Sequence, residues 1–153
     1  MKQFWLMKSE PEAFSLEDLK AQGAKGEHWD GVRNYQARNH MQNMQQGDLV
    51  IYYHSSCKPA GAVGVAKVIK EAYPDFTAFD HTERYYDAKS DPENPRWFMV
   101  DINYTKTLKN MVTLKDIKAN PLLSDMQLVT HARLSVSQMN EDHFNEILAM
   151  STL

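Results

Sequence analysis

Residues 47–68, GDLVIYYHSSCKPAGAVGVAKV, contain two apolar runs separated by a polar loop. The first run, residues 49–54, is rich in β-branched and aromatic side chains, which fit a pleated sheet better than a helix. The second run, residues 62–69, contains Gly64 and Ala66, which are small enough for another backbone or a ligand to approach closely. The stretch therefore predicts two strands joined by a loop, and a rigid sheet can hold such loop side chains in place as a site.

Length and composition indicate one domain in a reducing compartment. The chain has 153 residues, enough for one core that removes roughly two-thirds of the unfolded surface from water. A single cysteine excludes an internal disulfide framework and a cysteine-based zinc site. The apolar runs are far shorter than the roughly 18 residues needed to cross a bilayer, and the N-terminal residues lack the pattern of a signal peptide. We therefore expect a single cytoplasmic domain over residues 1–153, with no membrane partner.

The charge balance argues against a protein that coats duplex nucleic acid. The chain has 17 Lys and Arg residues against 20 Asp and Glu residues, for a net charge of −3. Because such a chain has no overall attraction for phosphate, any nucleic-acid contact must come from a local cluster of cations.

Further strands and helices are predicted on both sides of the central hairpin. Apolar and alternating patterns predict strands at residues 3–8, 97–104 and 133–136. Helices are predicted to begin after four residues that suit an N-cap: Ser15, Asn34, Thr113 and Asn140. Residues 71–96 combine three prolines with several aromatic residues, which predicts a packed flap rather than disorder. The expected fold class is α+β with a mixed sheet.

Several kinds of site find no support in the sequence. The six histidines show no metal-ligand spacing and no phosphate-binding glycine motif is present, so neither a metal nor a cofactor is expected. His54 and Cys57 are near enough in sequence for a thiol–imidazole pair, but nothing supplies an orienting third group or an oxyanion hole. An enzyme that processes a small molecule or nucleotide with these two residues is the alternative function. A protein-interaction module is a third.

Cations and aromatic residues recur at the predicted strand ends and helix starts. The cations are Lys8, Arg33, Lys58 and Arg133, and the aromatic residues near them in sequence are Trp5, Trp29 and Tyr35. A flipped-out or single-stranded base requires an aromatic face, hydrogen-bonding groups for its edge and positive charge for its phosphate. This combination indicates non-enzymatic recognition of a nucleobase.

Residues 29–34 also allow a purely structural interpretation. In that interpretation Trp29 belongs to the core, Arg33 forms an ion pair at the surface and Asn34 only caps a helix.

Motifs along almost the whole chain, in order and at matching spacing, resemble those of the EVE domain family. They are WLMKSEP at 5–11, WDGVRNYQARN at 29–39, YYHS at 52–55 with AVGVA at 62–66, PRW at 95–97 and RLSV at 133–136. The resemblance implies a PUA-like fold with a strongly bent, barrel-like sheet and helices packed around it, related to the YTH readers of methylated adenine in RNA. It also implies a concave pocket for a modified base, most often modified cytosine in DNA, with RNA as the other possible nucleic acid.

The resemblance assigns this pocket to particular residues. They are Lys8, Ser9, Trp29, Val32, Arg33, Asn34, Tyr35, His54, Ser55, Arg133, Leu134 and Ser135. We expect the base to stack on Trp29 while Asn34 and Ser55 pair with its edge. The candidates for a phosphate contact are Lys8, Arg33 and Arg133. A monomer is slightly favoured.

Overall fold

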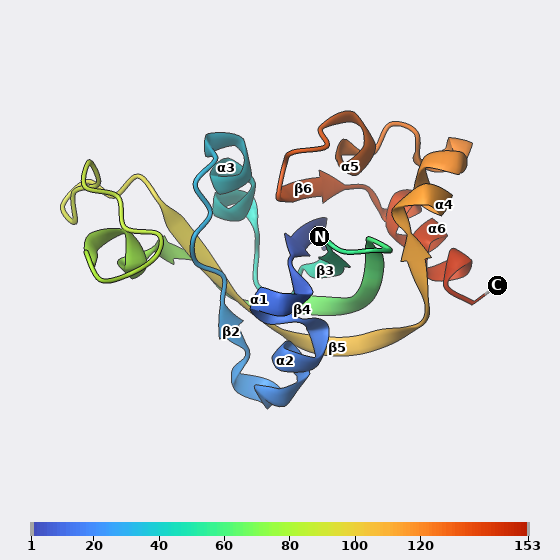
Figure 1. Ribbon diagram of the computed structural model, residues 1–153, viewed down its shortest axis with the longest axis horizontal. Helices are drawn as coiled ribbons and strands as arrows, with labels where there is room; N and C mark the ends of the chain where they lie inside the picture. The colour runs from blue at the N-terminus through green and yellow to red at the C-terminus, as the bar shows by residue number, and fades with distance from the viewer. Residues whose placement is uncertain (1, 153) are drawn as a thin grey trace.

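One six-stranded sheet organises the chain (Figure 1), which the computed structural model describes over residues 2–152. Its strands are β1 (Phe4–Ser9), β2 (Glu27–His28), β3 (Leu49–His54), β4 (Gly61–Pro74), β5 (Phe98–Thr113) and β6 (Val136–Met139). Their order across the sheet is β2-β5-β4-β3-β1-β6. Strands β1 and β3 are parallel and the other neighbouring pairs are antiparallel, so the sheet is mixed as expected.

The sheet bends strongly but stays open. The register between β4 and β5 shifts at four points, and such bulges increase local bending and twist. Over residues 2–152, β2 and β6 are the two edges of the sheet and do not pair, so the sheet is not closed into a barrel. The α+β class with a bent mixed sheet is confirmed, and the barrel-like curvature ends short of closure.

The hairpin predicted from residues 47–68 is present as β3 and β4. Gly64 has the close approach expected of it, because a Cβ there would lie 2.4 Å from Leu16 Cδ2 and 2.8 Å from the Lys106 carbonyl oxygen. Strands β4 and β5 are longer than predicted, reaching Pro74 and Thr113. The prediction ended each strand where polar residues interrupt the apolar pattern. Backbone pairing between the two strands does not depend on side-chain polarity, so the strands continue past that point.

The strand predicted at residues 133–136 is wrong except for its last residue. Strand β6 begins at Val136, which pairs with Met7 of β1. The preceding residues form a turn, in which the Leu134 N–H donates to the His131 carbonyl oxygen at 3.0 Å. The end of the turn remains tied to β1, because the Lys8 N–H donates to the Ser135 carbonyl oxygen at 2.9 Å, and Leu134 is buried in the core.

All four predicted helix starts are confirmed. The helices are α1 (Pro11–Phe14), α2 (Leu16–Ala21), α3 (Tyr35–Asn43), α4 (Leu114–Ala119), α5 (Gln127–Thr130) and α6 (Glu141–Met150). Short 3-10 helices are η1 (Gly23–Lys25), η2 (Phe76–Phe79) and η3 (Pro121–Leu123). The side chains of Ser15, Asn34, Thr113 and Asn140 each accept a hydrogen bond from the backbone N–H three residues later. These caps satisfy N–H groups that the first turn of a helix cannot pair.

In the described part of the chain, no helix has the length and apolar character of a membrane span.

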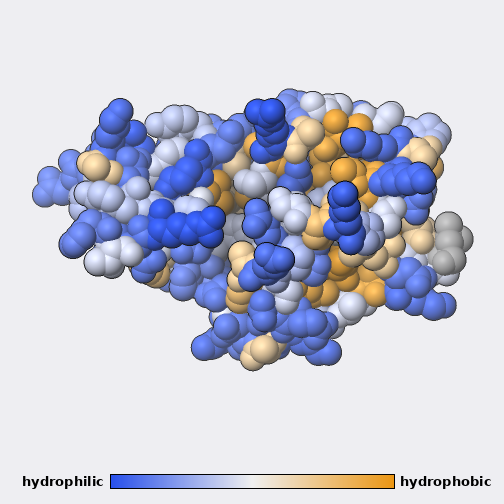
Figure 2. Space-filling view, in the orientation of Figure 1, coloured by the Kyte–Doolittle hydropathy of each residue, from blue (hydrophilic) through white to orange (hydrophobic). Residues whose placement is uncertain are grey.

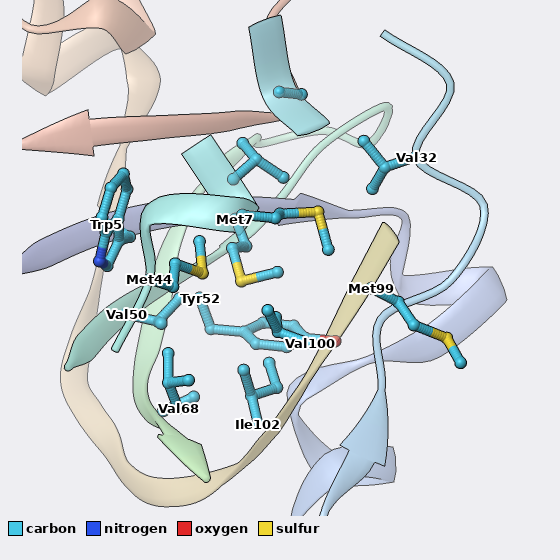
Figure 3. Close-up of a cluster of buried hydrophobic side chains, with 14 of the residues drawn as sticks. Trp5, Met7, Val32, Met44, Val50, Tyr52, Val68, Met99, Val100 and Ile102 are labelled. Carbon is cyan, nitrogen blue, oxygen red and sulfur yellow. The ribbon is translucent and has the colours of Figure 1, made fainter. Parts of the chain in front are cut away.

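The core has two parts, one on each face of the sheet. Alternation along β1 sends Trp5 and Met7 to one part and Phe4 and Leu6 to the other. The first part, in which Trp5 and Met7 lie near Val50 and Tyr52 of β3 (Figure 3), also includes apolar side chains from α2 and α3, and the second includes side chains from α4 and α6.

A buried carboxylate, Asp48, ties the start of β1 to the turn before β3. Asp48 is only 2% exposed. It accepts hydrogen bonds from the Trp5 indole N–H at 3.0 Å, the Gln3 backbone N–H at 3.0 Å and the Gln45 backbone N–H at 2.8 Å. Because its donors come from both segments, Asp48 holds the parallel pair β1–β3 in register at this end.

Candidate functional site

A cavity of about 640 Å³ lies where the C-terminal end of β1 meets β2, the segment 29–32 and the turn 132–135. Volumes of this size are typical of pockets that enclose a small molecule, and a nucleobase fits within it. The predicted site residues that line the cavity are Lys8, Ser9, Trp29, Val32, Ser55, Arg133 and Ser135. The lining residues that the sequence did not indicate are Glu10, Ala13, Phe14, Glu27, His28, Asp30, Gly31, Ser56, Arg84, Tyr85 and Ala132.

The parallel pairing of β1 and β3 places two serines at one edge of the cavity. Ser9 is in register with His54, and the Ser55 N–H donates to the Ser9 carbonyl oxygen at 2.9 Å. Both Ser9 and Ser55 line the cavity. The Ser9 hydroxyl donates to the Phe14 carbonyl oxygen at 2.7 Å, so it can only accept from a ligand, whereas a hydroxyl such as that of Ser55 can both donate and accept.

Trp29 belongs partly to the core and partly to the cavity. Its backbone N–H donates to the Val100 carbonyl oxygen at 2.7 Å, which fixes the segment that follows β2. The Trp29 ring packs edge-to-face against the Tyr52 ring, with the ring centroids 5.6 Å apart and the ring planes at 88°. Trp29 is partly buried against the core and also lines the cavity. The indole is therefore held rigidly and leaves surface for a ligand.

The cavity carries charges of both signs. Lys8, Arg84 and Arg133 line it together with the carboxylates of Glu10, Glu27 and Asp30. The Lys8 ammonium donates to the Ala132 carbonyl oxygen at 2.7 Å, and burial lowers the pKa of Lys8. A site of mixed charge provides partners for a polar base edge and attracts phosphate only weakly.

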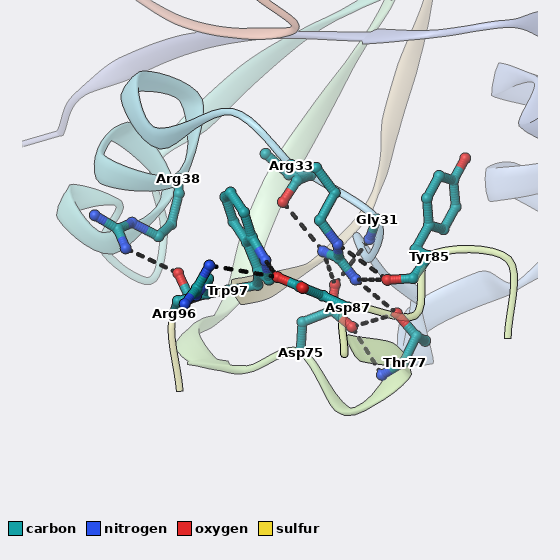
Figure 4. Close-up of polar contacts among 10 residues, drawn as sticks. Gly31, Arg33, Arg38, Asp75, Thr77, Tyr85, Asp87, Arg96 and Trp97 are labelled. Atoms are coloured by element: carbon teal, nitrogen blue, oxygen red, sulfur yellow. Dashed lines mark hydrogen bonds and ion pairs between the residues drawn. The ribbon is translucent and has the colours of Figure 1, made fainter. Parts of the chain in front are cut away.

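Arg33 does not line the cavity, because its guanidinium is engaged elsewhere (Figure 4). Its Nη1 lies 3.0 Å from Asp75 Oδ2 in an ion pair. Its Nε and Nη2 both donate to the Tyr85 carbonyl oxygen, at 3.0 Å and 2.6 Å. This geometry matches the structural interpretation of Arg33 and gives no support to the expected phosphate contact.

The first four residues of the predicted flap, 71–74, belong to β4, so the flap begins at Asp75, and the network around Arg33 holds it against the cavity. Asp75 also accepts a hydrogen bond from the Gly31 backbone N–H at 2.8 Å. The same carboxylate therefore ties the start of the flap to the segment 29–32. A Cβ on Gly31 would lie 2.5 Å from the Tyr85 ring, so only glycine permits this approach. The flap then contributes Arg84 and Tyr85 to the cavity, while its outer surface is hydrophilic (Figure 2).

The remaining predicted site residues have structural partners outside the cavity. Asn34 caps α3 by accepting from the Ala37 N–H at 2.9 Å. Tyr35 stacks on Trp97, with centroids 4.9 Å apart and planes at 21°. Leu134 is buried in the core.

His54 and Cys57 do not form the pair that the alternative function requires. His54 Nε2 accepts a hydrogen bond from the Leu16 backbone N–H at 3.1 Å, and burial lowers the pKa of His54, which favours this neutral acceptor. Cys57 Sγ instead donates to the Pro59 carbonyl oxygen at 3.5 Å. Within residues 2–152, no group of three or more His, Cys, Asp or Glu side chains is placed to hold a metal ion.

Replacing Cys57 with alanine is therefore expected to leave binding to a modified oligonucleotide within about threefold of wild type, since an unactivated cysteine acts as a small apolar side chain. Titration of labelled oligonucleotide with both proteins measures this. If the purified protein instead turns over a nucleotide and the Cys57→Ala variant loses that turnover, the result supports an enzyme that uses Cys57 and contradicts a site that only binds.

The cavity residues that were not predicted differ in how clearly the sequence pointed to them. Asp30 and Gly31 lie inside the motif WDGVRN, next to Trp29, so their neighbourhood was marked. Arg84 and Tyr85 lie in the flap, and no local pattern there points to a segment more than 50 residues earlier in the chain.

Comparisons with known proteins agree over nearly the whole chain. Residues 3–150 match the family model described as EVE domain. Thymocyte nuclear protein 1 of Gallus gallus is 42% identical over 163 residues, which cover 95% of this chain and 67% of that protein. Thymocyte nuclear protein 1 of Homo sapiens is 40% identical over 163 residues, covering 95% of this chain and 72% of that protein.

Solved structures show the same architecture. The human THYN1 protein in complex with DNA containing 5-methylcytosine is similar with a TM-score of 0.95 and 39% identity, covering 99% of both chains. A hypothetical protein from Leishmania major has a TM-score of 0.94 and 43% identity, covering 99% of this chain and 96% of that chain. The Mmi1 YTH domain, with a TM-score of 0.53 and 17% identity over 99% of this chain and 88% of that chain, shares the fold alone.

Proposed function

This chain belongs to the EVE domain family, and on that basis we propose that it binds DNA through a modified cytosine held in the cavity beside Trp29. The proposed activity is recognition without chemical change of the base. The human THYN1 structure in complex with DNA containing 5-methylcytosine supports the ligand class, because that chain aligns with this one over 99% of its length.

The observation that carries the proposal is the position of Trp29. An indole that is anchored in the core and lines a cavity of about 640 Å³ offers a preformed face on which a base can stack. A base reaches such a cavity only after leaving the helical stack or from a single strand. The methyl group of a modified cytosine adds little hydrogen-bonding information, so its recognition depends mainly on the apolar and aromatic wall.

Polar residues around Trp29 complete the proposed site. We expect Ser55 to pair with the base edge and Ser9 to accept from it, and we expect the phosphates to be contacted by Lys8, Arg84 or Arg133, all of which line the cavity. The proposed edge contact from Asn34 is replaced here by the serines, because the Asn34 side chain caps α3.

A binding screen tests the function directly. The purified protein is titrated with single-stranded and duplex oligonucleotides, DNA and RNA, that carry either cytosine or 5-methylcytosine at one position. We expect tighter binding to the modified DNA than to its unmodified match, with no change in the oligonucleotide on recovery. Equal binding to modified and unmodified strands, or binding to RNA alone, would contradict the proposal.

The salt dependence of binding is expected to be shallow. Three cations line the cavity, and two or three phosphate contacts on a single strand predict a slope of log K against log salt of about −1.5 to −2. Titrations between low and moderate salt measure this slope. A slope several times steeper would require an extended basic groove and would be inconsistent with a pocket on a protein of net charge −3.

A further inference from the structure

Asp30 differs from the other buried or half-buried carboxylates around the cavity because it lacks a partner on another residue. Asp75, which contacts Gly31 of the cavity wall, accepts several hydrogen bonds, and Glu27 lies 3.1 Å from His28 Nδ1. In the part of the chain that the structure describes, no other residue donates a hydrogen bond to the Asp30 carboxylate. Asp30 also lines the cavity beside Trp29.

This position is unfavourable for the free protein. Burial raises the pKa of the Asp30 carboxyl, with nearby His28 opposing the shift and the charges of Asp75 and Glu27 adding to it. A carboxylate that has lost part of its hydration gains most when a ligand supplies the missing donor. Asp30 is thus arranged for a ligand that brings an N–H group into the cavity.

We propose that Asp30 selects bases that carry an exocyclic amino group, by accepting a hydrogen bond from that group while the ring lies against Trp29. The inference rests on the proposed function, because it concerns the same cavity, and it names the chemical feature that the cavity reads. The amino-bearing bases are cytosine, adenine and guanine with their modified forms. Recognition of the 5-methyl group by the aromatic wall then narrows the choice to methylated cytosine.

The comparison of 5-methylcytosine with thymine isolates this feature. Both bases carry the 5-methyl group and have nearly the same shape. Cytosine presents the N4 amino donor, whereas thymine presents the O4 acceptor at that position. Thymine keeps one donor, N3–H, but the carbonyl oxygens on either side of it repel a carboxylate. A carboxylate therefore favours 5-methylcytosine, and an apolar wall alone treats the two bases alike.

The test uses single-stranded DNA of one sequence with cytosine, 5-methylcytosine or thymine at a single position, so that no pairing partner has to be broken. We expect wild-type protein to prefer 5-methylcytosine over thymine by about tenfold or more, as loss of a charge-assisted hydrogen bond implies. In the Asp30→Asn variant the amide can turn to accept from an amino group or donate to O4. Its preference is expected to fall to within about threefold.

A charge-matched control separates selection from a general change in charge. Glu12→Gln removes the same charge from an exposed residue of α1 that does not line the cavity, and it is expected to keep the wild-type preference. Thermal melting gives a second readout. Because the Asp30 charge is unfavourable in the folded state, Asp30→Asn is expected to melt at the same temperature as wild type or higher.

The outcomes distinguish this inference from the proposed function. If wild type binds 5-methylcytosine and thymine equally well but cytosine more weakly, Asp30 does not select the amino group and the cavity still reads the methyl group. Retention of the full preference by Asp30→Asn also overturns the inference. If wild type binds none of the three strands, the proposed function itself fails.

Discussion

Replacing Asp75 with alanine is expected to lower the free energy of unfolding by about 3–5 kcal/mol, the range for removing one partner of a buried ion pair. The Asp75 side chain has no exposed surface, and the side chain of Arg33, its partner, is 21% exposed. Asp75 also accepts from the backbone N–H groups of Gly31 and Thr77 and from the Thr77 hydroxyl. Alanine would leave the guanidinium and these donors without their acceptor.

Urea unfolding of wild type and variant measures this loss. Asp80→Ala is the matched control, since Asp80 is an exposed carboxylate of the same flap and accepts its hydrogen bonds from nearby Thr82. It is expected to leave stability nearly unchanged. If Asp75→Ala unfolds at the same urea concentration as Asp80→Ala, the network around Arg33 does not hold the flap as inferred.

Trp29→Ala is expected to weaken binding to DNA containing 5-methylcytosine by about 1–3 kcal/mol, the usual loss when one base–aromatic stack is removed. The indole lines the cavity and is oriented by its contact with Tyr52. Tyr35→Ala is the control, because Tyr35 is 52% exposed, stacks on Trp97 and does not line the cavity. Its affinity is expected to equal that of wild type.

Because Trp29 also packs against the core, affinity and stability must be measured on the same preparations. Trp29→Phe keeps an aromatic ring at this position with a smaller stacking face, so it is expected to bind between wild type and Trp29→Ala. A Trp29→Ala protein that binds as tightly as wild type but melts at a much lower temperature would show that Trp29 serves the core alone. The base would then stack on another aromatic residue of the cavity, such as Phe14 or Tyr85.

The sequence by itself determined the features that depend on neighbouring residues. The hairpin of β3 and β4 follows from two β-favouring apolar runs, and the four helix starts follow from side chains that cap the N–H three residues ahead. The motifs also marked Ser9, Trp29, Ser55 and the turn before β6 as one site, and all of them meet at the cavity. Their resemblance to the EVE domain family is confirmed by the match over residues 3–150.

Only the tertiary structure decided which charged groups line the cavity. Arg33 was a candidate for phosphate, but its guanidinium bonds to Tyr85, 52 residues later, and to Asp75. Lys8 is similarly oriented by Ala132, 124 residues away. A local sequence pattern predicts whether a side chain lies on a strand or caps a helix. It does not predict which distant group a charged side chain will bind, because folding brings that group close. For the same reason Asp30, to which no other residue among 2–152 donates a hydrogen bond, could be identified as a candidate for recognition only from the folded chain.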